Sequence, residues 1–157
     1  ELTAEFGGVD VLVNNAGQGG VGTAEQLSMD QIRAQAEVNY FAPVHLAKLV
    51  LPGMRERGRG TILTVTSVGG AVGQPFADAY CGAKFAVEGF MQSLAAVAER
   101  FGVHVRVIEP AAVTSDFVQN AVRPTDAGAD GELLQAYASR TAGAFANAPA
   151  TLRLPSS

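Results

Sequence analysis

At 157 residues the chain has the length of one domain and can bury a substantial hydrophobic core. Hydrophobic residues make up 48% of it and charged residues 17%, which indicates a globular protein and excludes a disordered one. The net charge of -4 gives no electrostatic support for binding nucleic acid or an anionic membrane.

The cysteine count and the hydropathy pattern indicate in which cellular compartment the chain is expected. Cys81 is the one cysteine, so no internal disulfide can form, and we expect a reducing, cytoplasmic compartment. No uncharged apolar run approaches a membrane span, and the first residues, ELTAEF, are acidic and unlike a signal peptide. The chain lacks an initiating Met, which predicts a processed chain or a piece of a longer one.

Three short β-branched runs predict buried strands at residues 9–13, 61–66 and 103–109. Helical periodicity predicts a helix from residue 29 that Gly58 and Gly60 end, and a second over 79–100 that Gly102 ends. Ser28 and Gln31 have the spacing of a capping box. Residues 120–131 read as a polar loop and 132–146 as a modest helix, whereas 147–157 show no clear pattern.

Strands that alternate with long helices predict parallel pairing, and therefore an α/β fold with a doubly wound parallel sheet. Ligands of such sheets bind at the carboxyl ends of the strands. The loops over residues 14–22, 67–76 and 110–117 should therefore meet there.

Residues 17–22 match the glycine pattern G-x-G-x-x-G directly after a strand. A dinucleotide fingerprint also requires a helix that opens at once and an acidic residue on the next strand. Here residues 23–27 form at most a short turn of helix, and the next predicted strand begins only at residue 61. We therefore favour a flexible glycine loop over a site.

Tyr80 and Lys84 stand four positions apart at the start of the second helix, so both lie on one face, one turn apart. They form either an amphipathic surface pair or a phenol held beside an ammonium so that it can lose its proton. A tyrosine pKa of about 10 would have to fall by about 3, or roughly 4 kcal/mol, to work near neutrality. An ammonium about 4 Å away supplies roughly 4 kcal/mol at an effective dielectric near 20, so we expect Lys84 to lower the pKa of Tyr80.

Five motifs in order resemble the short-chain dehydrogenase/reductase family over residues 9–117. They are Asn14-Asn15-Ala16-Gly17, Asn39 in a V-N-x-x-x-P context, Ser67 after the second strand, Tyr80 with Lys84, and residues 110–115 after the third strand. Residues 67–90 and 101–110 look most like the branch of 17β-hydroxysteroid and retinol dehydrogenases.

The resemblance implies a Rossmann-like oxidoreductase that transfers a hydride between NAD or NADP and a secondary alcohol or ketone, with steroid-like and retinoid-like compounds among the candidates. It implies that Tyr80 is the general acid/base, that Ser67 holds the substrate oxygen and that Asn39 places a water beside Lys84. The implied cofactor-binding residues are Asn15, Ala16, Gly17, Tyr80, Lys84, Pro110, Val113 and Ser115.

Each of these residues also has a purely structural interpretation. Ser67 could be a turn serine, Asn39 a helix-interior asparagine that bonds a neighbouring backbone group, and Tyr80 a half-buried core aromatic. For residues 15–17, 113 and 115 the alternative is ordinary loop packing. His45 and His104 have no second ligand at coordinating spacing, so no metal is expected.

The chain departs from the family pattern at both ends. The family's glycine-rich phosphate motif would precede residue 9, and its last strand is not evident, so we expect one partial domain over 1–157 that is incomplete at both ends. Residues 118–146 would form a substrate loop or lid. Within the motifs, Ala111 replaces the usual Gly and Ser115 the usual Thr.

Two further questions stay open at this point. The family often pairs its two long helices across the interface of a homodimer or homotetramer, and Phe90, Met91, Leu94 and Val97 suit such a face or a buried monomer face equally well. The alternative function is a truncated or catalytically silent module that binds a nucleotide or a partner at most.

Overall fold

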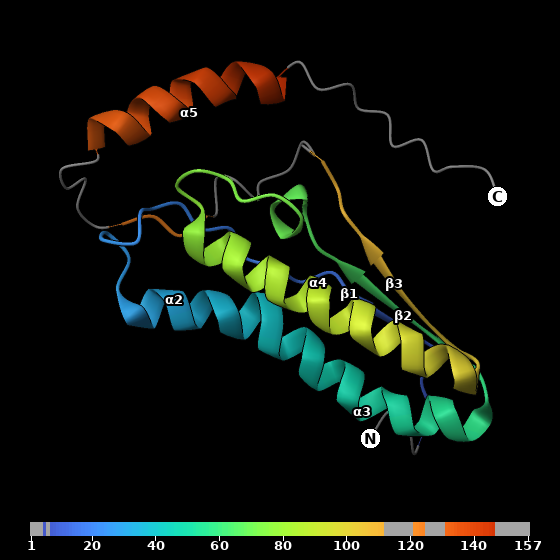
Figure 1. Cartoon of the computed structure of the whole chain (residues 1–157). Helices are drawn as coiled ribbons and strands as arrows, with labels where there is room; N and C mark the ends of the chain where they lie inside the picture. Colours follow the sequence, from blue (N-terminus) through green and yellow to red (C-terminus); the bar gives the residue numbers. More distant parts are fainter. Residues whose placement is uncertain (1–4, 6, 112–120, 125–130, 147–157) are drawn as a thin grey trace.

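The computed structural model describes residue 5 and residues 7–111, 121–124 and 131–146 (Figure 1). Its sheet has three parallel strands in the order β1 (Val11–Asn14), β2 (Gly60–Val65) and β3 (Val103–Ile108). Ile62 in the middle strand is in register with Leu12 and with Val105. The predicted strands are confirmed with ends that differ by at most two residues.

The first predicted helix is present but is not one regular helix. It consists of α2 (Met29–Ala36), a π-helical turn η1 (Glu37–Phe41) and α3 (Ala42–Arg57). The expected capping box begins α2, because the Ser28 N–H donates to Gln31 Oε1 at 2.9 Å and the Gln31 N–H donates to Ser28 Oγ at 3.2 Å.

Pro43 explains where the π-helical turn lies. A proline has no N–H, and its ring collides with the carbonyl four residues earlier, which here belongs to Asn39. The chain widens at this point, and the Ala42 N–H bonds the Glu37 carbonyl five residues back. The turn therefore releases the backbone carbonyl of Asn39 from the regular α-helical ladder.

The second predicted helix is α4 (Asp78–Ala98), followed by the 3₁₀ turn η3 (Glu99–Phe101). Gly58 and Gly102 end α3 and η3 with φ angles of 65° and 72°, as glycines at these positions predict. A Cβ on Gly102 would collide with the Gly58 carbonyl oxygen, so the two helix ends approach each other too closely for a side chain.

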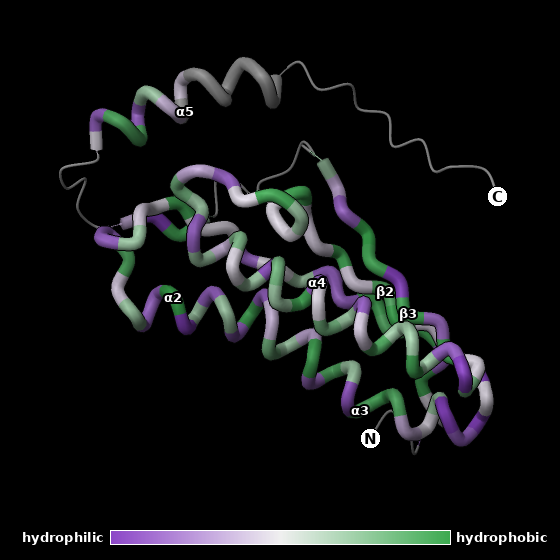
Figure 2. Tube along the Cα trace, in the orientation of Figure 1, coloured by the Kyte–Doolittle hydropathy of each residue, from purple (hydrophilic) through white to green (hydrophobic). Residues whose placement is uncertain are grey.

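The helices α3 and α4 cover one face of the sheet, as Figure 1 shows. The core between them consists of Ala47 and Met54 from α3, Val87, Met91 and Ala98 from α4, and Ile62, Val103 and Val105 from the strands. Hydrophobic and hydrophilic residues alternate along β3 (Figure 2). The hydrophilic residues His104 and Arg106 are exposed. On β1, Val11 and Val13 are each 55% exposed.

The structure shows which apolar residues of α4 lie in the core of the chain. Met91 is fully buried, and Phe90 and Leu94 pack against the core, so these three stabilise the chain itself. Val97 is 58% exposed. None of the helices in the described ranges is long and apolar enough to cross a membrane.

The last described helix, α5 (Gly131–Ala146), confirms the helix expected over 132–146. Its Tyr137 ring lies 5.2 Å from the ring of Phe76 in the loop before α4. Phe76 has a φ of 62°, a region that bulky residues rarely adopt. The segments expected at 112–117 and 147–157 lie outside the described residues.

Candidate active site

The three loops that follow the strands meet, as the sequence predicts. The Gly22 N–H bonds the Phe76 carbonyl at 2.7 Å, which joins the first loop to the second. The Val68 N–H bonds the Pro110 carbonyl at 3.3 Å, which joins the second loop to the third. The carboxyl edge of the sheet is therefore one continuous surface over its described residues.

The glycine segment 17–22 does not open a helix, so the structure gives it no fingerprint geometry. It is held by short parallel bridges instead, Gly20 with Val122 and Gly22 with Ala77. Its Val21 N–H also bonds the Val122 carbonyl at 2.9 Å. The sequence analysis did not predict these bonds, because their partners Ala77 and Val122 lie far along the chain.

Asn39 lies in the π-helical turn and is 1% exposed. Its Oδ1 accepts from the Gln18 N–H at 3.1 Å, and its Nδ2 donates to the Gln18 carbonyl at 2.9 Å. The side chain therefore bonds the backbone of the glycine loop, 21 residues away, in addition to the side chain of Gln35 one helical turn earlier. The released backbone carbonyl of Asn39 stays separate from these bonds.

Gln35 is a buried residue that the sequence analysis missed. It accepts from Asn39 Nδ2 at 3.1 Å and donates to the Gly19 carbonyl at 3.0 Å. A Cβ on Gly20 would lie 2.7 Å from Gln35 Nε2, so the loop closes directly over this amide. The available signal was a polar side chain one helical turn before Asn39.

Tyr80 and Lys84 lie on one face of α4 and are 7% and 4% exposed. The side chain of Ser67, directly after β2, is hydrogen-bonded to the Tyr80 side chain. Ser67 Oγ also accepts from the Gly69 N–H at 3.1 Å. Lys84 Nζ donates to the Val65 carbonyl at 3.2 Å and lies 5.8 Å from the centroid of the Tyr80 ring.

The expected effect of Lys84 on the pKa of Tyr80 is wrong for this arrangement. Burial raises the pKa of Tyr80 above its usual value, and the hydrogen bond with Ser67 only partly offsets this. Burial also lowers the pKa of Lys84. The ammonium is directed to the Val65 carbonyl, so the desolvation of the phenol outweighs its attraction.

Of the predicted cofactor-binding residues, Asn15, Ala16 and Gly17 are exposed at the end of β1. A Cβ on Gly17 would lie 3.2 Å from Asn39 Oδ1 and 3.4 Å from Lys84 Nζ, so the loop backbone passes beside the lysine. Pro110 lies against the turn after Ser67. The predicted residues Val113 and Ser115 lie outside the described residues.

Asn14, at the end of β1, has only one of its two polar side-chain atoms paired. Its Nδ2 donates to Thr64 Oγ1 at 3.2 Å, but its Oδ1 is the one buried side-chain oxygen or nitrogen of the described residues that has no partner. A buried acceptor without a partner normally costs free energy. Within the same residues, no group of three His, Cys, Asp or Glu side chains could hold a metal ion.

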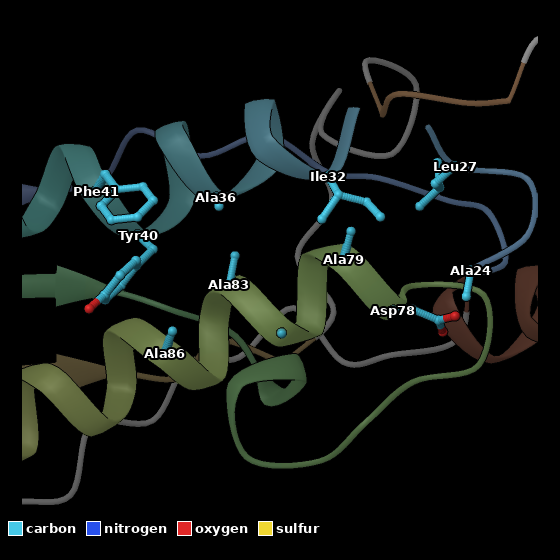
Figure 3. A pocket seen from close by; sticks show the side chains of 11 residues that line it. Ala24, Leu27, Ile32, Ala36, Tyr40, Phe41, Asp78, Ala79, Ala83 and Ala86 are labelled. Atoms are coloured by element: carbon cyan, nitrogen blue, oxygen red, sulfur yellow. The ribbon is translucent and has the colours of Figure 1, made fainter. Parts of the chain in front are cut away.

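An apolar groove of about 400 Å³ lies beside this cluster, between α2 with η1 and the start of α4 (Figure 3). Ile32, Ala36 and Tyr40 form one wall, and Ala79, Ala83 and Ala86 form the other. Asn39, Ser67, Tyr80 and Lys84 do not line it. The groove is therefore a neighbouring surface and not the polar site itself.

A parallel sheet with a Ser–Tyr–Lys cluster at the carboxyl edge, where ligands of such sheets bind, places the chain in the class of Rossmann-like proteins. The family model described as short chain dehydrogenase matches residues 1–126. The chain belongs to this short-chain dehydrogenase family.

Relatives and solved structures agree with the family. Human retinol dehydrogenase 8 is 45% identical over 74% of this chain, and human 17-beta-hydroxysteroid dehydrogenase type 1 is 43% identical over 74%. The match spans only 37% and 35% of those two relatives. The expected resemblance to this branch is confirmed.

Two solved structures share the fold. A short-chain dehydrogenase from Streptomyces avermitilis matches 90% of this chain and 53% of its own, with 33% identity and a TM-score of 0.81. An NAD+-bound xylitol dehydrogenase matches 74% of this chain and 45% of its own, with 26% identity and a TM-score of 0.70. The chain therefore spans about half of these known structures or less.

Proposed function

We propose that the protein is an NAD(P)-dependent dehydrogenase or reductase of a secondary alcohol or ketone, with Tyr80 as its general acid/base. The observation that carries the proposal is the hydrogen bond between Ser67 and Tyr80, one turn from the buried Lys84, at the carboxyl edge of the sheet. A carbonyl–alcohol conversion needs a proton on oxygen beside the carbon that exchanges a hydride.

The chemistry of each side chain follows from its surroundings. The raised pKa of Tyr80 keeps its phenol protonated near neutrality, so it can donate a proton to a carbonyl oxygen in the reductive direction. Ser67 turns its hydroxyl toward the same oxygen and holds it against the phenol. Asn39 Oδ1 and Lys84 Nζ both lie near Gly17, and in this proposal a water beside Lys84, positioned by Asn39, returns the proton.

The chain fits the nicotinamide end of a dinucleotide. The exposed backbone of residues 15–17 lies beside Lys84, at a distance where a side chain on Gly17 would intrude. NAD or NADP, when bound, supplies or accepts the hydride. The unpaired Asn14 Oδ1 offers a further buried acceptor on the β1 side of this region.

The substrate class is inferred from the relatives, whose names point to retinol and to a 17β-hydroxysteroid. Residues 118–146 would form the substrate loop, and the contact between Tyr137 and Phe76 brings its described helix over the loop before Tyr80. A large apolar alcohol or ketone would suit a site beside the rings of Phe76 and Tyr137.

A Tyr80→Phe substitution in the complete protein tests the assignment. We expect turnover to fall at least about a thousandfold, because the proton donor is lost while the ring is kept. Tyr40→Phe is the matched control and should keep turnover. Wild-type turnover in Tyr80→Phe would overturn the proposal.

The competing function is a module without catalysis. A titration of the 157-residue chain with NADH and with NADPH separates the two at the level of binding. Saturable binding of either dinucleotide counts against the degenerate module, whereas no binding by this chain favours it.

We also propose that copies of the chain pair through the outer faces of α3 and α4. Large apolar side chains are exposed there, including Leu46 at 43%, Leu49 at 63% and Val97 at 58%. Sedimentation should show a dimer that Leu49→Glu dissociates. A monomeric parent chain would contradict this pairing.

A further inference from the structure

The end of β2 is attached to α4 by consecutive residues. The Val65 carbonyl accepts from Lys84 Nζ, and the Ser67 side chain bonds the Tyr80 side chain. These two contacts join the strand to side chains one helical turn apart. They leave one residue of the strand end, Thr66, between them.

Thr66 makes the third contact of this series, with Glu88. The Thr66 hydroxyl donates to Glu88 Oε1 at 2.5 Å, and Gln92 Nε2 donates to Glu88 Oε2 at 3.1 Å. The Thr66 N–H also bonds the Ile108 carbonyl at 2.8 Å, which includes the end of β3. Glu88 stands one turn beyond Lys84, so Tyr80, Lys84 and Glu88 form one stripe.

Glu88 is buried as deeply as the lysine. Each is 4% exposed, and they are the two buried charged side chains of the described residues. They form no ion pair with each other at 4.0 Å or less. A Cβ on Gly70 would lie 2.8 Å from Glu88 Cγ, so the glycine turn after Ser67 closes directly over this carboxylate.

We propose that Glu88 is a positioning residue, which fastens the end of β2 and the Ser67 turn to α4 and balances the charge of the buried Lys84 ammonium. This inference rests on the proposed function, because the groups that Glu88 positions are those assigned to proton transfer. Glu88 itself does not reach the reacting atoms.

The charges around Lys84 support the electrostatic part. Burial lowers the pKa of Lys84, and the negative charge of Glu88 acts in the opposite direction. Tyr80 and Cys81 are the other titratable groups of α4 near it. The charged and titratable side chains of α2, η1, α3 and β3 are exposed to solvent, apart from the half-buried Tyr40 and Arg57. The exposed ones are Asp30, Arg33, Glu37, His45, Lys48, Arg55, Glu56, His104 and Arg106. Arg57 donates to the Val9 carbonyl. Within the described residues, Glu88 is therefore the buried counter-charge.

The chain contains two lysines, Lys48 and Lys84, so lysine Cε and Nζ signals of an isotopically labelled chain give one exposed reference and one reporter. Glu88→Gln keeps the shape and can still bond Thr66. We expect its Lys84 titration midpoint to fall by about one pH unit while that of Lys48 stays constant. Glu99→Gln, an exposed carboxylate eleven positions further along the chain, removes the same charge and should shift neither. An unchanged Lys84 midpoint in a folded Glu88→Gln chain would overturn the electrostatic role.

Glu88→Asp keeps the negative charge at this position but shortens the side chain. The aspartate cannot maintain the hydrogen bond with Thr66, so this variant separates the effect of the charge from that of the bond. We expect a Lys84 midpoint near that of the parent chain, and in the complete protein a kcat about tenfold lower with KM unchanged. Equal kcat would overturn the anchoring role. Activity that survives Tyr80→Phe would instead defeat the proposed function, and the lysine titration would still stand.

Discussion

The two sides of β2 differ in how completely their polar groups are paired. Toward α4 and β3, Thr66, Ser67 and Lys84 each have a hydrogen-bond partner, and the strands are covered by helices. Toward β1, Asn14 Oδ1 is buried without a partner, and Val11 and Val13 are more than half exposed. The described residues therefore pair the polar groups fully on the side proposed for proton transfer. The side proposed for the nucleotide has a buried acceptor without a partner and a strand with exposed valines.

The largest expected effect contrasts packing on the two sides. Val103→Ala should lower the free energy of unfolding by about 2–3 kcal/mol, because Val103 is fully buried and its removal leaves a cavity. Val13→Ala should cost less than about 0.5 kcal/mol, because Val13 is 55% exposed. Chemical denaturation measures both values. Equal losses would show that β1 is covered in solution.

The next effect contrasts two buried threonines of the β2 region. Thr66→Val should cost about 2 kcal/mol, because it removes a hydrogen bond from a buried carboxylate. Thr64→Val removes a bond between neutral groups, with Asn14, and should cost about 1 kcal/mol. The two variants have the same change in shape, so the reverse order in denaturant titrations would contradict the pairing described.

Gly17→Ala tests the nucleotide side. Its Cβ would crowd Asn39 Oδ1 and Lys84 Nζ and would extend over the exposed loop, so we expect about tenfold weaker NADH binding, or about 1.4 kcal/mol. Gly73→Ala is the control, because its Cβ would meet no atom within 4 Å. Fluorescence titration gives both dissociation constants. Unchanged affinity in Gly17→Ala would place the cofactor elsewhere.

The smallest effect is on the pH dependence of stability. Burial lowers the pKa of Lys84 in the folded chain, so between that value and the unfolded value of 10.5 the unfolded chain binds more protons, and the contribution of Lys84 to the free energy of unfolding rises with pH. Denaturant titrations in alkaline buffer should show this rise in the parent chain and in Lys48→Met, but not in Lys84→Met. The same pH slope in all three chains would contradict the lowered pKa of Lys84.

The repetitive features of the fold could be predicted from the sequence, because hydrophobic periodicity and glycine stops act locally. The spacing of Tyr80 and Lys84 likewise predicted a shared face on α4. The direction of the Lys84 ammonium could not be predicted, because it depends on a carbonyl of β2, nineteen residues away. The same holds for Gln35 and Glu88, whose partners Gly19 and Thr66 are distant in sequence.

The π-helical turn has a consequence for the whole rod formed by α2 and α3. Its buried positions 35, 39, 43, 47 and 54 are spaced 4, 4, 4 and 7, and a strict α-helix would turn these positions gradually off one face. If the one extra residue of the π-helical turn is left out of the count between positions 39 and 43, the spacing becomes 4, 3, 4 and 7. Positions with this spacing lie on a single face of an α-helix. The extra residue of the turn therefore lets Pro43 follow Asn39 within one continuous rod, while the buried positions before and after it stay on a single helix face.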